Sequence, residues 1–399
     1  MKYSVALCYL THNHPDVIRE VFDNSLNAYS SHGIDVFVYD DSDDEQTRNI
    51  VCEYIEKGFE NLYYVDAHGV EGGDHKYLLV MQGAGLPKDY DYIWPCKDRV
   101  YFSSAYLDRL CEALDEDNDV VMGLSEDVRC EIVPCVYKDY YTDPGEFYRK
   151  YALFSTNWEC TIRKRTTMLD PIDWDYYREK YGVNEHCNFN QPISLYARIA
   201  EMESFRVRVC RFGNDDRYIS DKVTSHWGGI LFELWIERWV SANYRLPGIY
   251  DDLKAEAIKS QTNVYELFGS LELMIRYNMD NLFTKEVYEK YRNIWPFVTD
   301  LAPECLEMVA EGRVDDATGF LIDDLKKTIN EGNYNKAYWY LKTNSWFKHV
   351  FSEKEYGILN HFFWLYGSQM FVYGKSNVFD GVSSLEDILK MGGHRSTDV

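Results

Sequence analysis

The run YIWPCKDRVYF, at residues 92–102, is apolar until it reaches one carboxylate, Asp98, which stands between Lys97 and Arg99. Short buried strands that end on acidic residues often hold a divalent cation for a phosphate-bearing ligand. Such sites usually present two carboxylates, and this run offers one. Asp98 is therefore a candidate ligand for Mg²⁺ or Mn²⁺, and the ammonium of Lys97 could replace part of the metal's charge.

Strand-like runs and amphipathic stretches alternate over residues 1–125. We expect strands at residues 3–10, 34–39, 62–66, 90–95 and 119–124, with helices over 45–57, 72–85 and 103–114 and another that begins near Pro15. Asn13 or His14 stands where it could cap that first helix. Strands that alternate with helices at this spacing predict an α/β fold with a mainly parallel sheet flanked by helices.

Ligands of such sheets bind beyond the carboxyl ends of the strands, and polar residues occupy those ends. No Gly-x-Gly-x-x-Gly follows the first strand and the sequence has no P-loop, so the usual dinucleotide and P-loop sites lose their main support. Besides Lys97 and Asp98, the candidates are Thr11 and Asn13 after the first strand, Asp40 and Asp41 after the second, and Asp74 and Lys76 after the third.

Three segments, LTHNHPDVIREVFDNSL, VYDDSDDEQT and DYIWPCKDRVYF, resemble in their order and spacing the nucleotide-sugar-binding half of the family 2 glycosyltransferases. The resemblance covers residues 1–125 well and residues up to 230 loosely. It implies a GT-A (Rossmann-like) fold and a UDP-sugar donor. It also implies an acceptor hydroxyl on a glycan, a glycoprotein or a lipid-linked sugar of bacterial surface glycan assembly.

The resemblance further implies that the strand ends hold the uridine. The chain around Thr11 and Asn13 and a carboxylate of Asp40 or Asp41 would contact the uracil and ribose, because a carboxylate accepts hydrogen bonds from a ribose diol or from the uracil N–H. For the acidic pair, the alternative is a solvated turn that caps the next helix.

Asp74 and Lys76 lie where the family brings further contacts to the base and the pyrophosphate. Lys76 would add a cation to helix N-terminal amides that already favour phosphate. A surface lysine on a helix is the alternative.

The chain departs from the family at the metal motif. Members usually place Asp-x-Asp where this chain has Cys96-Lys97-Asp98, so only the last acidic position matches. One carboxylate can hold Mg²⁺ or Mn²⁺ when the diphosphate and water supply the other oxygens. His226 is the second predicted ligand, by its position near the end of the catalytic portion, with packing beside Trp227 as the alternative.

An inverting transfer needs a carboxylate that takes the proton of the acceptor hydroxyl. In the family this base stands at or just before a later helix, which here has Pro192 in its first turn. Glu185 is the nearest acid, although it lies seven positions before Pro192, and Asp127 after the fifth strand is the second candidate. An exposed loop acid is the alternative for both.

The bulk composition excludes several partners. The net charge of -24, from 66 acidic and 42 basic residues, disfavours nucleic acid and anionic membrane surfaces. No apolar run reaches the length of ~20 residues that spans a bilayer. We therefore expect a cytoplasmic protein without a transmembrane segment.

After residue 230 the strand signals end and helical spacing continues. We expect residues 1–229 to form the nucleotide-sugar-binding and catalytic domain, and residues 230–399 to form an α-helical domain for acceptor docking, homo-oligomerisation or bracing. The metal motif with a single carboxylate and this helical region also support an alternative hypothesis. In it the protein is a non-catalytic glycosyltransferase-like scaffold that binds a partner enzyme or an acceptor protein.

Overall fold

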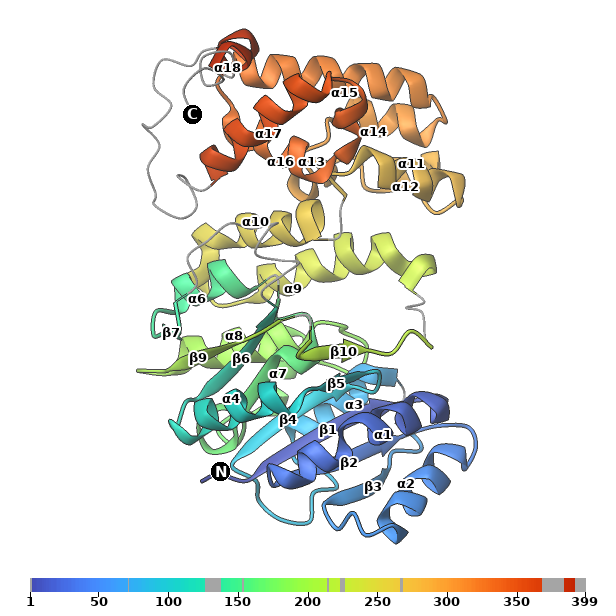
Figure 1. The fold of residues 1–399 in the computed structure, drawn as a ribbon, viewed down its shortest axis with the longest axis vertical. Coiled ribbons are helices and arrows are strands. Elements are labelled where there is room, and N and C mark those ends of the chain that lie inside the picture. Colours follow the sequence, from blue (N-terminus) through green and yellow to red (C-terminus); the bar gives the residue numbers. More distant parts are fainter. Residues whose placement is uncertain are drawn as a thin grey trace. The chain divides into compact units, whose positions relative to one another are not determined.

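The computed structural model of the chain describes residues 2–70, 72–125, 138–152, 154–213, 215–222, 227–265, 268–367 and 384–391. These residues separate into two compact units. The first unit comprises the described residues of Met1–Asp127, Lys138–Trp227 and Glu237–Ala257, and the second comprises those of Gly228–Ile236 and Ile258–Val399. Figure 1 shows the sheet of the first unit and the helices of the second.

The first unit is built on an eight-stranded sheet with the order β3-β2-β1-β4-β8-β6-β9-β7. The strands are β1 Val5–Thr11, β2 Ile34–Asp40, β3 Leu62–Asp66, β4 Tyr92–Lys97, β6 Val120–Ser125, β7 Tyr140–Tyr141, β8 Thr161–Lys164 and β9 Val207–Phe212. The first four in this order are parallel neighbours, β6 and β9 form a second parallel pair, and β8 runs antiparallel between β4 and β6. Every residue of β1 is buried, as a sheet covered on both faces requires.

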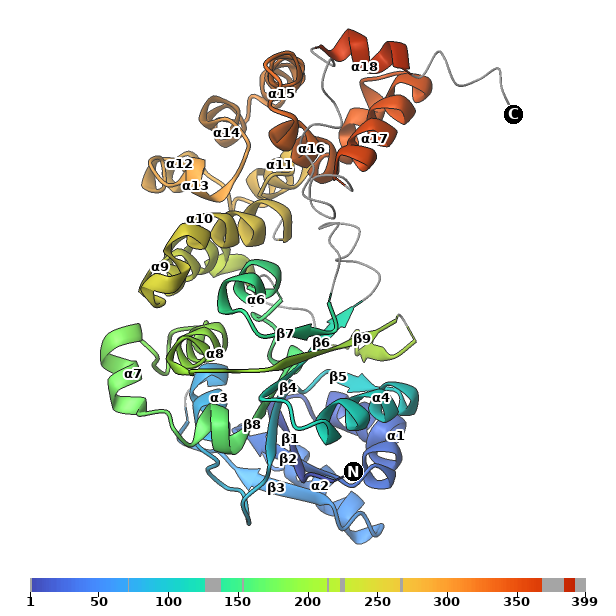
Figure 2. The same ribbon diagram turned by 90° about the vertical axis from the view of Figure 1, so that its left-hand side faces the viewer.

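Helices cover both faces of this sheet (Figure 2). One face carries α1 Pro15–Ser31, α2 Gln46–Glu56 and α4 Ser104–Asp115, and the other carries α3 Gly72–Met81, α7 Trp174–Tyr181 and α8 Asn190–Glu201. The buried stripe of α1, which includes Ile18, Val21, Phe22 and Leu26, joins the core of the strands. The predicted α/β fold with a mainly parallel, helix-flanked sheet is confirmed.

Shorter elements complete the first unit. They are β5 Val100–Phe102, paired antiparallel with β10 Arg217–Ile219, and the helices α6 Pro144–Tyr151, α9 Trp239–Arg245 and α10 Asp251–Lys259. A buried tyrosine cluster joins α6 and the turn before α10 to α8: the ring centroid of Tyr148 lies 4.9 Å from that of Tyr196 and 4.6 Å from that of Tyr250. Tyr250 belongs to the segment Glu237–Ala257, which forms part of the first unit.

The second unit is helical in its described part, as predicted for the C-terminal region. Its helices include α11 Leu271–Met279, α12 Lys285–Lys290, α13 Trp295–Val298, α14 Pro303–Ala310, α15 Val314–Asn330, α16 Tyr334–Thr343, α17 Glu353–Gly367 and α18 Leu385–Met391. Phe232, Phe268, Phe283 and Trp295 form an aromatic core there. Across the residues that the structure describes, no helix has both the length and the apolar character needed to cross a bilayer.

Candidate functional site

The main candidate site is the rim, which we define as Thr11, His14, Asp40, Asp41, Lys76 and Asp98. These residues lie at the carboxyl ends of β1, β2 and β4 and at the start of α1 and α3. Strand pairing sets Thr11 opposite Asp40 and Leu10 opposite Lys97, so the polar residues that follow three adjacent strands meet at one edge of the sheet.

Asp98 is held in place by two donors. Its Oδ2 accepts a hydrogen bond from Thr11 Oγ1 at 2.9 Å and lies 2.7 Å from His14 Nδ1. The hydrogen bond with Asp98 raises the pKa of His14. The side chain of His14 is thereby turned to Asp98 and makes no capping bond to α1, although His14 occupies the capping position. Asp98 is 8% exposed, and its Oδ1 receives no hydrogen bond from the part of the chain that the structure describes.

Lys76 is a buried cation that links two strand ends. Its side chain is 3% exposed, and Nζ donates to the backbone oxygen of Thr11 and to Asp41 Oδ1, each at 2.6 Å. An ammonium has three N–H donors, so these contacts leave one for a ligand. Lys76 is thus part of the rim and not a surface lysine.

Asp40 and Asn13 fix the loops of the rim. Asp40 is fully buried and accepts hydrogen bonds from the Ser42 backbone N–H at 3.0 Å, from Ser42 Oγ at 2.5 Å and from the Tyr64 hydroxyl at 3.2 Å. Asn13, with a φ of 57°, donates its backbone N–H to Ser42 Oγ and exchanges hydrogen bonds with Asp43. The loops after β1 and β2 are therefore tied together, and Asp41 is the acid of the predicted pair that meets Lys76.

Lys97 lies beside a second buried acid. Its Nζ donates to Asn157 Oδ1 at 3.1 Å, and its charge acts on Glu159, which is ion-paired with Arg217. Burial alone would raise the pKa of Glu159, but the cations of Lys97 and Arg217 outweigh it and lower that pKa to about 2. Lys97 is thus attracted to Glu159, although the ion pair of Glu159 is with Arg217.

Asp74 contacts α8, across from Lys76 on the same helix. Its Oδ2 accepts from Asn188 Nδ2 at 3.1 Å and its Oδ1 from Asn190 Nδ2 at 3.2 Å. Asp74 is 6% exposed, and burial raises its pKa to about 7, against the lowering effect of the contacts with Asn188, Asn190 and the Arg238 charge. Asp74 and Lys76, the two candidate residues on α3, thus contact different partners.

The predicted catalytic acids are placed only in part. The Glu185 side chain is 35% exposed in the loop before α8 and lies 3.6 Å from Arg178. A hydrogen bond from its own backbone N–H, followed by the charges of Arg178, His75 and His186, lowers the pKa of Glu185, so the carboxylate is ionised at neutral pH. Asp127 and the predicted metal ligand His226 lie outside the described residues.

Sequence reasoning did not identify His14, Glu159, Asn188 or Asn190 as partners of the candidate residues. The sequence predicts His14 only as a cap, and its position three residues after Thr11 is the available signal for a place in the site. Glu159 is the single acid of the run WECTIRKR, at residues 158–165, and this is a weak signal. Asn188 and Asn190 lie more than a hundred residues from Asp74 in sequence, and no local pattern links them.

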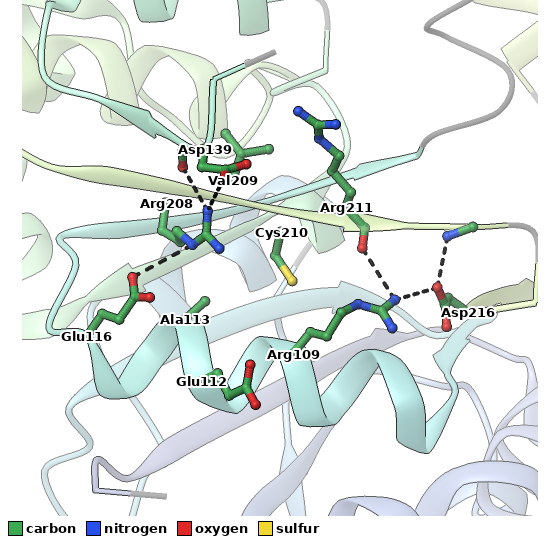
Figure 3. A pocket seen from close by; sticks show the side chains of 11 residues that line it. Arg109, Glu112, Ala113, Glu116, Asp139, Arg208, Val209, Cys210, Arg211 and Asp216 are labelled. Atoms are coloured by element: carbon green, nitrogen blue, oxygen red, sulfur yellow. Dashed lines mark hydrogen bonds and ion pairs between the residues drawn. The ribbon is translucent and has the colours of Figure 1, made fainter.

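A hollow of about 520 Å³ lies between α4 and β9 (Figure 3). Its charged side chains largely pair with one another: Arg109 with Asp216, and Arg208 with Glu116 and Asp139. No residue of the rim lines it. Because most of its charges are already partnered, this hollow is a weaker candidate than the rim.

The chain matches no family model and no curated protein. Among solved structures, it is similar to the complex of residues 1–349 of S. aureus TarS with UDP-GlcNAc, at 13% identity and a TM-score of 0.44, over 79% of this chain and 89% of that one. It is similar to the mannosyltransferase PcManGT of Pyrobaculum calidifontis with GDP-Man and Mn²⁺, at 13% identity and a TM-score of 0.45, over 86% and 84%. It is also similar to the glucosyl-3-phosphoglycerate synthase of Mycobacterium tuberculosis with Mn²⁺ and UDP, at 11% identity and a TM-score of 0.37, over 62% and 81%. At these values the similarities do not decide the function of this chain.

Proposed function

We propose that the protein is a glycosyltransferase that moves a sugar from a UDP-sugar to an acceptor hydroxyl with inversion. The observation that carries the proposal is the rim, where the buried ammonium of Lys76 joins Thr11 to Asp41 and where Thr11 also meets Asp98. Ligands of α/β sheets bind beyond this edge. The mainly parallel sheet agrees with the GT-A fold that the sequence resemblance implies.

Each rim group has a role in donor binding. The chain around Thr11 and Asn13 and a carboxylate of Asp40 or Asp41 would hold the uracil and ribose, and the remaining N–H of Lys76 would donate to the diphosphate. Of the two acids, Asp41 is the better placed, because Asp40 is fully buried. Lys97 and Asp74 are further proposed contacts. A buried ammonium suits this task because its attraction for phosphate is less screened than it would be in water.

A divalent cation, Mn²⁺ or Mg²⁺, fits Asp98. Within the described residues, no group of three or more His, Cys, Asp or Glu side chains could hold a metal alone. Asp98 Oδ1 nevertheless has no hydrogen-bond donor there, and one carboxylate suffices when phosphate and water supply the other oxygens. We propose Asp98 as the ligand, with His226 as a second. A cation bound there would neutralise charge on the leaving diphosphate.

The proposed base is Glu185, with Asp127 as the second candidate. As the acceptor oxygen bonds to the anomeric carbon, the bond from that carbon to the diphosphate breaks and the base takes the hydroxyl proton. The ionised state of Glu185 allows it to accept this proton. We propose a glycan, glycoprotein or lipid-linked acceptor of bacterial surface glycan assembly, a cytoplasmic location, and the helical second unit as a docking or oligomerisation element.

The second candidate function is a non-catalytic scaffold on the same sheet. The observation in its favour is that the single carboxylate of the metal motif is already engaged by Thr11 and His14.

A thermal-shift panel of UDP- and GDP-sugars, with and without Mn²⁺, separates the two candidates. A ligand at 100 times its dissociation constant stabilises the fold by about 2.7 kcal/mol. We expect a shift with a UDP-sugar and a slow release of UDP that Asp98→Asn abolishes. The control is Asp89→Asn, which removes an exposed carboxylate. The absence of any thermal shift would favour the scaffold function. Full turnover in excess EDTA would refute the proposed dependence on a metal ion.

A further inference from the structure

A second hollow, of about 360 Å³, lies within the first unit between the loop that precedes α8 and one face of the α9 segment. Asn184, His186 and Cys187 line it from the loop, and Arg238, Ser241 and Arg245 line it from the helical segment. The last three residues follow the spacing of a single helix face. The volume is within the range of small-ligand pockets, which begins at roughly 300 Å³.

The charge of this pocket runs against that of the chain. Two arginines line it against one carboxylate, Glu237, although the whole protein carries a net charge of -24. A concave surface with an excess of one charge concentrates ligands of the opposite charge. The pocket is therefore suited to an anion.

The two arginines differ in what balances them. Arg238 donates to the His186 backbone oxygen at 3.1 Å and to Asn188 Oδ1, and it lies near the buried carboxyl of Asp74. Arg245 packs its guanidinium against Gly182, where a Cβ would lie 1.6 Å from Nη1. No carboxylate forms an ion pair with Arg245 in the portion of the chain that the structure describes. Arg245 is thus an exposed cation that is paired with no carboxylate of the described residues.

The pocket adjoins the proposed catalytic machinery. The loop that lines it also carries Glu185, and Asn188 in that loop contacts Asp74 on α3. The same helix delivers Lys76 to the rim. The pocket is therefore lined by Asn184 and His186, the chain neighbours of the proposed base Glu185.

We propose that this pocket binds an anionic group of the acceptor, a phosphate or a carboxylate, with Arg245 as its principal contact. The identification of the bound molecule as the acceptor rests on the proposed function. Guanidinium recognises both anions through two parallel N–H···O bonds, in a geometry that lysine does not reproduce.

Calorimetric titration of the full chain with glycerol 3-phosphate, glycerate and neutral glycerol tests the pocket, and repeating it with UDP present competes for anion sites at the rim. We expect an anion to bind and glycerol not to bind, and the preferred anion distinguishes phosphate from carboxylate. Arg245→Gln should weaken binding by about tenfold or more, the cost of a charged hydrogen bond. Ser241→Glu, which adds a negative charge to the same helix face without touching Gly182, should weaken it as well.

Arg149→Gln is the matched control, because Arg149 is an exposed arginine of α6 and its loss changes the net charge equally; it should bind as the wild type does. Equal binding by Arg245→Gln and the wild type, or no binding of either anion by the wild type, would overturn the proposal. A separate UDP-sugar titration keeps the two proposals apart. Arg245-dependent anion binding without nucleotide-sugar binding would refute only the transfer, and UDP-sugar hydrolysis without anion binding would refute only the pocket.

Discussion

Replacing Asp74 with asparagine is expected to change how the stability of the first unit depends on pH. Burial raises the pKa of this carboxyl from 3.8 to about 7, so the folded state holds its proton more tightly than the unfolded chain does. The resulting stabilisation is complete below pH 3.8 and is lost as the pH rises through 7. At 1.36 kcal/mol per pKa unit, the loss between pH 5 and pH 7 is about 2 kcal/mol.

The assay is urea unfolding of the wild type and of Asp74→Asn from pH 5 to pH 8. Asn190 is held by Asn184 through two hydrogen bonds and cannot turn freely to suit an amide at position 74. The variant therefore also has a pH-independent loss, and the readout is the slope. The wild-type advantage should shrink by about 2 kcal/mol from pH 5 to pH 7. Glu179→Gln, which removes an exposed acid of α7, should parallel the wild type. If the stability of Asp74→Asn follows the same pH dependence as that of the wild type, burial does not raise the pKa of Asp74.

Three further outcomes are expected. Lys76→Met should destabilise the fold by about 3 kcal/mol, because it leaves the poorly exposed Asp41 without the Lys76 cation. It should also weaken UDP-sugar binding in calorimetry, and Lys76→Arg should restore part of the stability and of the affinity. An unchanged affinity of Lys76→Met would remove Lys76 from the proposed donor site. Gly182→Ala should cost at least about 1 kcal/mol in urea unfolding, since Gly182 has a φ of 74° and abuts Arg245, whereas Gly248→Ala, which meets no contact below 3.5 Å, should cost less. Glu185→Gln should abolish sugar transfer in a UDP-release assay and spare UDP binding, and unchanged turnover would exclude it as the base.

The sequence predicted the sheet because its strands are uniformly apolar and regularly spaced. It could not reveal the direction of β8, since the run at residues 158–165 reads equally well for either direction. The structure begins this strand at Thr161, after a short turn, and sets it antiparallel between β4 and β6. The packing of Tyr148 on Tyr250 is likewise a contact between segments distant in the chain.

The candidate site was predictable where a residue follows a strand directly. Thr11, Asp41 and Asp98 gather because parallel strands share their carboxyl edge, whereas Lys76 reaches the same edge from within α3. Their partners were not predictable, because the choice between a helix cap and an ion pair for His14 depends on which side chain the next strand brings within reach. Asp98 stands 84 positions away in sequence.

The knot of Asn13, Ser42 and Asp40 has a consequence for the timing of ligand capture. Since these side chains tie the β1 and β2 loops to each other, little backbone freedom remains to be lost there when the proposed donor binds. A prearranged donor side of the proposed site would favour fast docking of the donor. Any adaptive movement would then fall to the segments that contact the acceptor.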